Sequence, residues 1–297
     1  MLSPRRLVVL REFVAQGTIA GAAEALAFTP SAVSQQLAQL QREAGIELFR
    51  KRGRRLELTD AGRMLAARSG SVLAALEQLE ADLAREAGEV RGVVRLASFQ
   101  TATRALVMPA LERLAAAHPA LRVELTELEA EDSLPLLARG GVDVAIAVEY
   151  EHAPRPHLAE LHRDELEADE LVLTLPRDHP LADGRDALPL AALRGETWAC
   201  ARADTNYADM FVRVCRIAGG FEPVIHHRVN DIGMLIDLVA VGGVAALLPS
   251  LGQPDEDPRV AVRPVAEGPF TRALFVAPRT AARGRPSTAA WPRTARA

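Results

Sequence analysis

A threonine followed by a proline near residue 30 restricts the conformations open to the start of this chain. Thr29 is a good helix N-cap, and Pro30 suits the first helical position, where its missing N–H leaves no hydrogen bond unmade. We therefore predict a helix that begins at Pro30. Three residues at helical spacing form a thin apolar line along it: Val33, Leu37 and Leu40.

The other face of this helix is neutral and suits contact with DNA bases. At about 100° per residue, Ser31 and Gln35 lie opposite Val33 and point away from the core. In a major groove a glutamine pairs twofold with adenine, and a serine hydrogen-bonds to several bases. The alternative is an ordinary solvated helix of a small bundle. The neighbouring segments decide between the two.

Two further helices are predicted before Pro30. Four apolar residues recur at three- and four-residue steps, which indicates an amphipathic helix from about residue 4 to residue 16: Leu7, Leu10, Phe13 and Val14. Thr18 can cap a second, alanine-rich helix, whose small side chains let another helix approach closely. The order is that of a helix-turn-helix, in which the second helix of the motif enters the major groove.

A basic hairpin is predicted next. Leu56 and Leu58 alternate with a polar residue as in a strand, Gly53 allows a tight turn, and five of the six residues from 50 to 55 are cationic. Residues 1–62 hold nine basic and six acidic side chains, a net +3, whereas the other 26 basic and 33 acidic side chains give −7. We therefore predict a winged helix-turn-helix whose wing cations neutralise phosphates or enter the minor groove.

A long helix is predicted from about residue 60 to residue 87, where proline is absent. Its apolar residues follow steps of seven, four, three and four, as in a coiled-coil seam: Leu65, Val72, Leu76, Leu79 and Leu83. Such a stripe either packs on the chain's own body or pairs with a second chain, and we favour pairing. A dimer would place two recognition helices about one turn of DNA apart.

After Gly92 the sequence alternates between short apolar runs and helical stretches, which predicts an α/β fold of two lobes with a mostly parallel sheet and a return strand around residues 271–277. The predicted domains are a winged helix-turn-helix (1–59), a linker and dimerisation helix (60–90), a two-lobed ligand-binding domain (91–280) and a partly disordered C-terminal segment (281–297). Within the two-lobed domain, lobe I comprises about 91–163 and 264–280, and lobe II about 164–263.

Candidate ligand-binding residues follow the predicted strands, because ligands of open α/β sheets bind beyond the carboxyl ends of strands, often at a helix N-terminus. A loop over residues 98–103, leading into a helix at Ala105, offers hydroxyls and free N–H groups for a carboxylate. For this loop and for the corresponding loops of the second lobe, an equal alternative is that the polar residues only cap helices and form turns. The candidates are Ser98, Phe99, Gln100 and Thr101 in the first lobe, and Arg202, Thr205 and Asn230 in the second.

The first sixty residues resemble the N-terminal domain of the LysR-type transcriptional regulators. The family pattern "LF.R..R...LT.AG" is matched by Leu48-Phe49, Lys51, Arg54, Leu58-Thr59 and Ala61-Gly62. Lys51 stands where the family usually has arginine, which keeps the charge and loses a bidentate fork. The resemblance implies that DNA contacts involve Thr29, Pro30, Ser31, Ala32, Ser34 and Gln35 of the recognition helix, and Arg52 and Arg54 of the wing. Thr18 and Lys51 complete the candidate DNA-binding residues.

The rest of the chain resembles the regulatory part of the same family, which is built like a periplasmic solute-binding protein. The stretch "VAVGGVAALLPSL" matches the family's "G.G.ALLP" turn, so the resemblance covers about residues 4–280. It implies a sequence-specific regulator of transcription, binding double-stranded DNA and a small-molecule effector of unknown identity. It also implies homodimers that in many relatives pair into tetramers, contact with RNA polymerase in activators, and an imperfect inverted repeat near the chain's own promoter.

Other functions have weaker support. No apolar run approaches the roughly 20 residues of a membrane-spanning helix, and the start lacks a signal-peptide pattern, so we expect a cytoplasmic protein with no membrane contact. Cys200 and Cys215 fit no metal spacing and are expected to be buried, with a redox pair as the alternative. We expect no cofactor, no metal and no catalytic residues. The alternative function is a solute-binding module or an enzyme with a non-functional DNA-binding domain.

The C-terminal tail departs from the family, which usually closes the first lobe with a helix. Pro286 can start that helix, whereas Pro292 would break it early, so we expect the last six residues to be disordered. The sequence leaves open the operator, the target genes and the choice between activation and repression.

Overall fold

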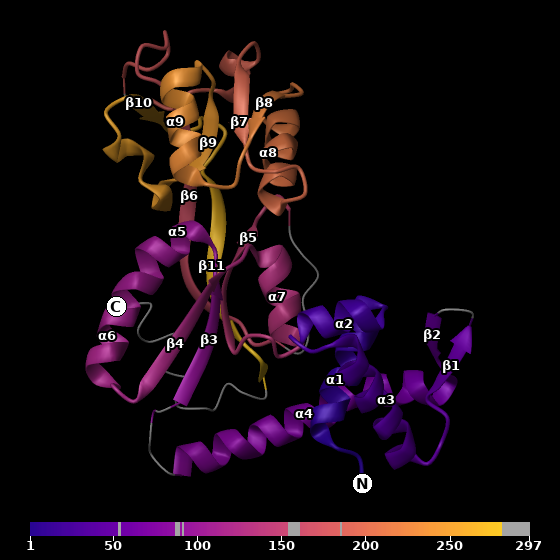
Figure 1. Cartoon of the computed structure of the whole chain (residues 1–297). Coiled ribbons are helices and arrows are strands. Elements are labelled where there is room, and N and C mark those ends of the chain that lie inside the picture. Colours follow the sequence, from indigo (N-terminus) through magenta and orange to yellow (C-terminus); the bar gives the residue numbers. More distant parts are fainter. Residues whose placement is uncertain (53–54, 87–89, 91, 154–160, 185, 281–297) are drawn as a thin grey trace. The chain divides into compact units, whose positions relative to one another are not determined.

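The computed structural model describes residues 1–52, 55–86, 90, 92–153, 161–184 and 186–280. The chain forms two compact units, one built mainly from Met1–Glu89 and the other mainly from Val90–Ala138 and Val142–Arg279. Figure 1 shows the N-terminal unit in indigo and purple and the second unit from purple through magenta and orange to yellow. The predicted C-terminal segment, 281–297, lies outside the described residues.

The N-terminal unit contains the predicted helices. Its elements are α1 (Pro4–Gln16), α2 (Ile19–Ala25), α3 (Pro30–Ala44), β1 (Phe49–Arg52), β2 (Arg55–Leu58) and α4 (Asp60–Glu86). The hydroxyl of Thr18 accepts from Gly21 N at the start of α2, and that of Thr29 accepts from Ala32 N at the start of α3. Both predicted caps are therefore confirmed. A small core holds the helices together and includes Leu10, Phe13, Val33, Leu37 and Leu40.

The wing is anchored to α3 at its base. Strands β1 and β2 pair antiparallel from Phe49–Leu58 to Arg52–Arg55, as a hairpin requires. Gln41 Oε1 accepts hydrogen bonds from the backbone N of Leu48 (3.0 Å) and of Phe49 (3.1 Å). The expected turn residue Gly53 lies outside the described residues.

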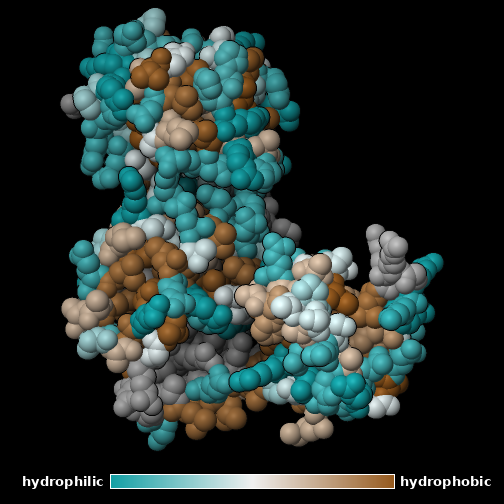
Figure 2. Space-filling view, viewed as in Figure 1, coloured by the Kyte–Doolittle hydropathy of each residue, from teal (hydrophilic) through white to brown (hydrophobic). Residues whose placement is uncertain are grey.

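Helix α4 is continuous over the predicted range, and the N-terminal unit covers only the first part of its apolar stripe. Leu65 packs against the core of the N-terminal unit. Farther along, the exposed fractions are 48% for Val72, 37% for Leu76, 56% for Leu79 and 64% for Leu83. Figure 2 shows apolar surface along this part of the helix. Packing within the N-terminal unit therefore does not account for the seam beyond Leu65.

The second unit contains a mixed sheet, which corrects the prediction of a mostly parallel one. Strands β3 (Gly92–Ser98), β4 (Leu121–Glu127) and β5 (Val144–Tyr150) are parallel, as expected for β-α-β units. Two long strands, β6 (Asp164–Pro176) and β11 (Phe270–Pro278), run antiparallel to each other, and β11 also runs antiparallel to β5. With β10 (Val260–Arg263) at one edge, the order is β10-β6-β11-β5-β3-β4.

The two long strands run in opposite directions because β6 carries the chain from the first lobe to the second and β11 carries it back (Figure 1). The first half of β6 pairs with β11, and its second half pairs in the upper lobe with β9 (Ala246–Pro249) and β10 (Val260–Arg263). A separate parallel pair, β7 (Thr197–Cys200) and β8 (Val224–Arg228), completes that lobe.

Helices flank these strands. They are α5 (Gln100–Ala102), α6 (Met108–Ala117), α7 (Ala130–Ala138), α8 (Asn206–Ile217) and α9 (Ile232–Gly242). Short 3-10 turns span Leu190–Leu193, Ser250–Gly252 and Pro254–Glu256.

The prediction of a loop over residues 98–103 is wrong, because the loop is shorter. Helical backbone begins at Gln100 and continues through a π-helical turn, Thr103–Val107, into α6. Pro109, the second residue of α6, has no N–H to donate to the carbonyl four residues earlier, which favours the wider turn before it.

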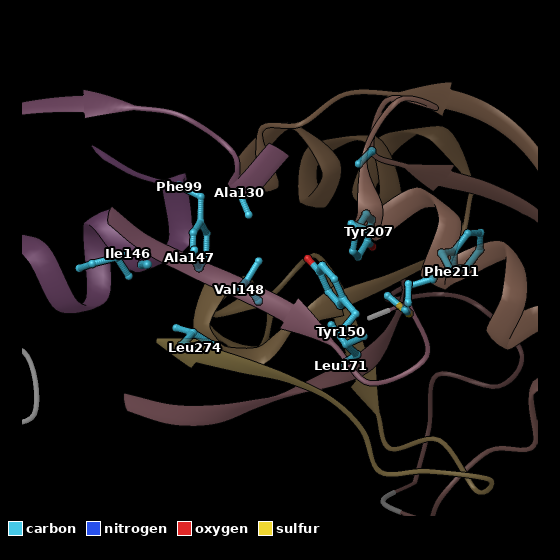
Figure 3. Packing of buried hydrophobic residues seen from close by; sticks show 14 of the residues in the cluster. Phe99, Ala130, Ile146, Ala147, Val148, Tyr150, Leu171, Tyr207, Phe211 and Leu274 are labelled. Carbon is cyan, nitrogen blue, oxygen red and sulfur yellow. The ribbon is translucent and has the colours of Figure 1, made fainter. Parts of the chain in front are cut away.

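The main core of the second unit runs through both lobes. Figure 3 shows Ile146 and Ala147 on β5 in the first lobe, and Tyr207 and Phe211 on α8 in the second. In the second lobe the rings of Trp198 and Phe211 lie 5.1 Å apart between centroids. A smaller cluster packs α9 against β9 and β10. This shared core fixes the strand ends where the two lobes meet.

Candidate functional site

The face of α3 that we predict to read DNA is accessible. Thr29, Pro30, Ser31, Ser34 and Gln35 are exposed, and Ala32 is half-buried. Their direction follows from the burial of the opposite face, where Val33 and Leu40 are completely enclosed. Thr29 Oγ1 lies 3.0 Å from Ser31 Oγ, so the two hydroxyls form one polar group at the start of the helix.

The cations of the wing are also accessible. Lys51 and Arg52 are exposed. Glu57 on the facing strand lies 3.8 Å from Arg50 and 3.6 Å from Arg52, in pairs whose arginine side chains are more than half exposed. Pairs of this kind contribute little, about 0–1 kcal/mol, and release their cations readily to phosphates. Arg54 lies outside the described residues, and Thr18 is an exposed cap of α2.

A pocket of about 40 Å³ lies where the two lobes meet. Five of the predicted ligand-binding residues line it: Phe99, Gln100, Thr101, Thr205 and Asn230. The structure does not bring the other two to it. Ser98 is completely buried, with its hydroxyl 3.4 Å from Phe99 O, and Arg202 pairs with Asp204 at the surface.

Sequence reasoning missed the charged and phenolic residues of this pocket, Glu129, Glu131, Tyr150, Tyr207 and Arg272. The first two follow β4 and the third ends β5, at the carboxyl ends of parallel strands, so the rule applied to β3 would have found them. Arg272 is a charged residue within a largely apolar strand, and this pattern could have marked it as a candidate site residue. Figure 3 shows Tyr150 on β5 facing Tyr207 on α8.

Arg272 is buried and fully engaged. Its Nε donates to Asp169 Oδ2 (2.8 Å), and its Nη2 donates to Thr101 Oγ1 (2.7 Å). Asp169 also accepts from Leu251 N at 2.9 Å. The guanidinium lies over the ring of Phe99, 5.2 Å from its centroid. This network ties β6, β11 and α5 together beside the pocket.

Two side chains of the first lobe hold the second lobe by its helix N-termini. Glu131 Oε1 accepts from Asn206 N, the first residue of α8, at 2.6 Å. Gln100 Oε1 accepts from Ile232 N, the first residue of α9, at 2.8 Å, while its amide donates to Asp231. An N-terminal N–H group has no partner within its own helix, so each contact satisfies a group that the helix leaves open. The lobes are therefore joined on both sides of the pocket.

A larger cavity of about 760 Å³ shares Gln100 and Thr101 with the pocket. It is rich in carboxylates, which include Glu167, Asp169 and Glu170, and among the described residues Arg104 is the basic side chain that lines it.

The two cysteines are buried, as predicted. Burial raises the pKa of Cys200 and of Cys215 to about 12. Both thiols stay protonated near neutral pH, where the thiolate is the reactive form. Their environment is that of packed apolar side chains, not of a reactive pair.

Comparison with known proteins assigns both units to one class. Residues 4–63 match the family model described as the bacterial regulatory helix-turn-helix protein of the lysR family, and residues 87–297 match the LysR substrate binding domain. A DNA-binding domain is thus joined to a ligand-binding domain, and this combination defines a ligand-responsive transcription regulator. The chain belongs to the LysR family of transcriptional regulators.

Curated relatives cover most of the chain. The HTH-type transcriptional regulator AlsR of Bacillus subtilis is 30% identical over 232 residues, which is 77% of this chain and 74% of that protein. The HTH-type transcriptional regulator CatR of Pseudomonas putida is 31% identical over 233 residues, which is 77% of this chain and 76% of that protein.

Solved structures share the fold. Full-length CbnR complexed with its target DNA has a TM-score of 0.57 at 20% identity and matches 99% of this chain and 98% of that chain. A full-length OxyR variant from Pseudomonas aeruginosa has a TM-score of 0.71 at 17% identity and matches 100% of this chain and 95% of that chain. In the described part of this chain, no helix combines the length and apolar character needed to cross a membrane.

Proposed function

We propose that this regulator reads a pair of DNA half-sites as a homodimer and that a small molecule in the inter-lobe pocket changes how it holds them. The exposed neutral face of α3, next to a basic wing, is the observation that carries the proposal. Short polar side chains at the N-terminal end of a recognition helix contact base edges, whereas the wing cations contact phosphates. The first group supplies sequence information and the second supplies affinity.

Footprinting on the DNA upstream of the chain's own gene tests this function. At about 150 mM salt with competitor DNA, the purely electrostatic part of binding is suppressed. We expect two protected half-sites about one helical turn apart. Diffuse binding that disappears as salt rises would show that α3 does not read bases at this promoter.

Gln35→Ala tests the recognition helix directly. A bidentate contact to a base is worth about 1–3 kcal/mol, so we expect affinity for the protected site to fall by about 5- to 150-fold. Affinity for unrelated DNA should stay the same, because phosphate contacts are untouched. Gln39→Ala is the matched control, since Gln39 lies one turn farther along and accepts from Arg42 Nε at 2.9 Å. Equal losses in both variants, or equal losses on both DNAs, would contradict the assignment.

The dimer is proposed to form through α4. Val72, Leu76, Leu79 and Leu83 lie within about 60° of one another on the helix and are all exposed. An apolar stripe with coiled-coil spacing is stabilised by a partner helix.

Leu79→Glu should therefore give a monomer at micromolar concentration in analytical ultracentrifugation. A charge in the seam has to be buried without a partner on dimerisation. The matched variant Ala67→Glu places the same charge on an exposed position of the opposite face and should remain dimeric. Dimerisation that survives Leu79→Glu would place the interface elsewhere. A second pairing of dimers into tetramers would be seen in the same experiment.

The ligand is proposed to act by a population shift. Because Glu131 and Gln100 join the lobes beside the pocket, a ligand that prefers one lobe arrangement shifts the equilibrium toward it. In linked dimers this changes the spacing of the recognition helices and the bend of the DNA. We further propose that the protein works in the cytoplasm, contacts RNA polymerase where it activates, and has no enzymatic activity and no cofactor besides its effector.

A further inference from the structure

The charged side chains of the inter-lobe pocket do not suit an anion. Among the described residues, the charged ones that line it are Glu129, Glu131 and Arg272, so carboxylates outnumber guanidinium groups there. The positive charge of Arg272 is already balanced, because its Nη2 lies 2.7 Å from Oδ2 of Asp169, which does not line the pocket. Among the described lining residues, negatively charged groups are therefore in excess.

The backbone groups that would bind a ligand carboxylate are also occupied. Helix N-termini attract anions, and α8 and α9 both begin beside this pocket. At α8 the first N–H is already bonded to the carboxylate of Glu131, and at α9 it is bonded to the amide oxygen of Gln100. A ligand carboxylate would have to displace the chain's own acceptors. The positions at which an anion would bind are therefore occupied by side chains of the protein itself.

Among the described residues of the pocket, Glu129 has a carboxyl group that is available to a ligand. It is half-buried, and among the described residues its carboxyl accepts no hydrogen bond and forms no ion pair. The rings of Phe99, Tyr150 and Tyr207 line the same pocket, and those of Tyr150 and Tyr207 lie 6.0 Å apart between centroids. Aromatic faces and carboxylates both attract cations.

We propose that this pocket binds a small molecule with a positively charged nitrogen, an amine in its ammonium form, and that Glu129 is its counter-ion. The proposal rests on the function proposed above and names the chemical class of its effector. The cavity of about 40 Å³ limits the ligand to a few atoms beyond the ammonium group unless the lobes move. Its N–H groups would donate to Glu129, and its carbon atoms would contact the aromatic rings.

The charge state of Glu129 gives the binding a characteristic pH dependence. Burial, followed by repulsion from Glu131, raises the pKa of Glu129 to about 7, while Arg272 acts in the opposite direction and Glu127 and Asp132 add smaller repulsions. Burial also raises the pKa of the Tyr150 phenol in the same pocket to about 12, so this group stays neutral. An ammonium ion binds the ionised carboxylate, so affinity should rise with pH up to about 7 and level off above it. A carboxylate ligand would show the opposite trend.

The test uses three probes of similar size on the full-length protein: 1-propylamine, propionate and 1-propanol. In isothermal titration calorimetry we expect saturable binding of 1-propylamine alone. Glu129→Gln should weaken that binding by at least about tenfold, because a hydrogen bond to a charged group is lost. The control Glu127→Gln removes a nearby carboxylate that does not line the pocket and should change the affinity less than about twofold. Thermal unfolding of both variants confirms that they are folded.

The outcomes separate this proposal from the proposed function. Propionate binding as tightly as 1-propylamine, no saturable binding of 1-propylamine, or equal binding by Glu129→Gln would each overturn the ligand class. Promoter footprinting is independent of the probe. Protected half-sites together with any of these results would support the proposed regulator function and contradict only the proposal of an ammonium ligand.

Discussion

Arg272→Met should lower the free energy of unfolding of the ligand-binding unit by about 3–5 kcal/mol, the usual effect of removing one partner of a buried ion pair. Arg272 and Asp169 are both almost completely buried, with side-chain exposed fractions of 4% and 5%. Methionine fills similar space but leaves the Asp169 carboxylate without its cation. It also leaves the Thr101 hydroxyl without its donor.

Differential scanning calorimetry measures the stability of Arg272→Met and of two comparison variants. Arg272→Met combined with Asp169→Asn should be more stable than Arg272→Met alone, because asparagine carries no charge and its oxygen still accepts from Leu251 N. The matched control is Arg259→Met, which removes an arginine that is half exposed and paired with Asp257 and Asp237. Its effect should stay below about 1 kcal/mol. Equal destabilisation by Arg259→Met and Arg272→Met would mean that burial of the pair is not the cause.

Gly62→Ala should be the most damaging single-methyl substitution in the DNA-binding unit. A Cβ at this position would lie 2.2 Å from the carbonyl oxygen of Leu48 and 2.9 Å from Cδ2 of Leu58. The Leu48 carbonyl cannot withdraw easily, because it accepts from Thr59 N at 2.9 Å, and Thr59 in turn caps the start of α4 through its hydroxyl. Overpacking usually costs about 1–3 kcal/mol, and a backbone obstacle places this variant at the upper end or beyond.

The effect of Gly62→Ala should appear both in urea unfolding and in DNA affinity, since the wing begins at the displaced segment. Gly70→Ala, in the same helix, is the matched control because a Cβ there meets nothing within 4 Å. Alanine favours a helix over glycine by about 1 kcal/mol, so Gly70→Ala should be neutral or stabilising. Wild-type stability of Gly62→Ala would show that the Leu48 segment is free to move.

Local patterns in the sequence were sufficient for the N-terminal unit. Thr29 and Pro30 fix where α3 begins through one side-chain hydrogen bond and one missing N–H, and Val33 to Leu40 fix which face is inside. These effects act within a single helical turn, so they can be read without knowing the fold. The wing was predictable for a similar reason, because Leu56 and Leu58 alternate within one strand.

The ligand pocket was only partly predictable, because its residues come from separate strands. Gln100 and Thr205 follow strands that the apolar runs identify. Glu129 and Tyr150 obey the same rule, yet nothing local distinguishes them from other polar residues at strand ends. Ser98 fits the local pattern and is nevertheless enclosed by packing.

The sequence by itself determined the helix-turn-helix, the basic wing, the continuous α4 and the α/β character of the rest, because hydrogen bonding and apolar periodicity within short segments specify each of them. Only the tertiary structure decided that β6 and β11 run antiparallel between the lobes, that Asp169 neutralises Arg272, and that Glu131 occupies the N-terminus of α8. These last features join residues 75 or more positions apart, and their charges act through space, where the order of residues along the chain carries no information.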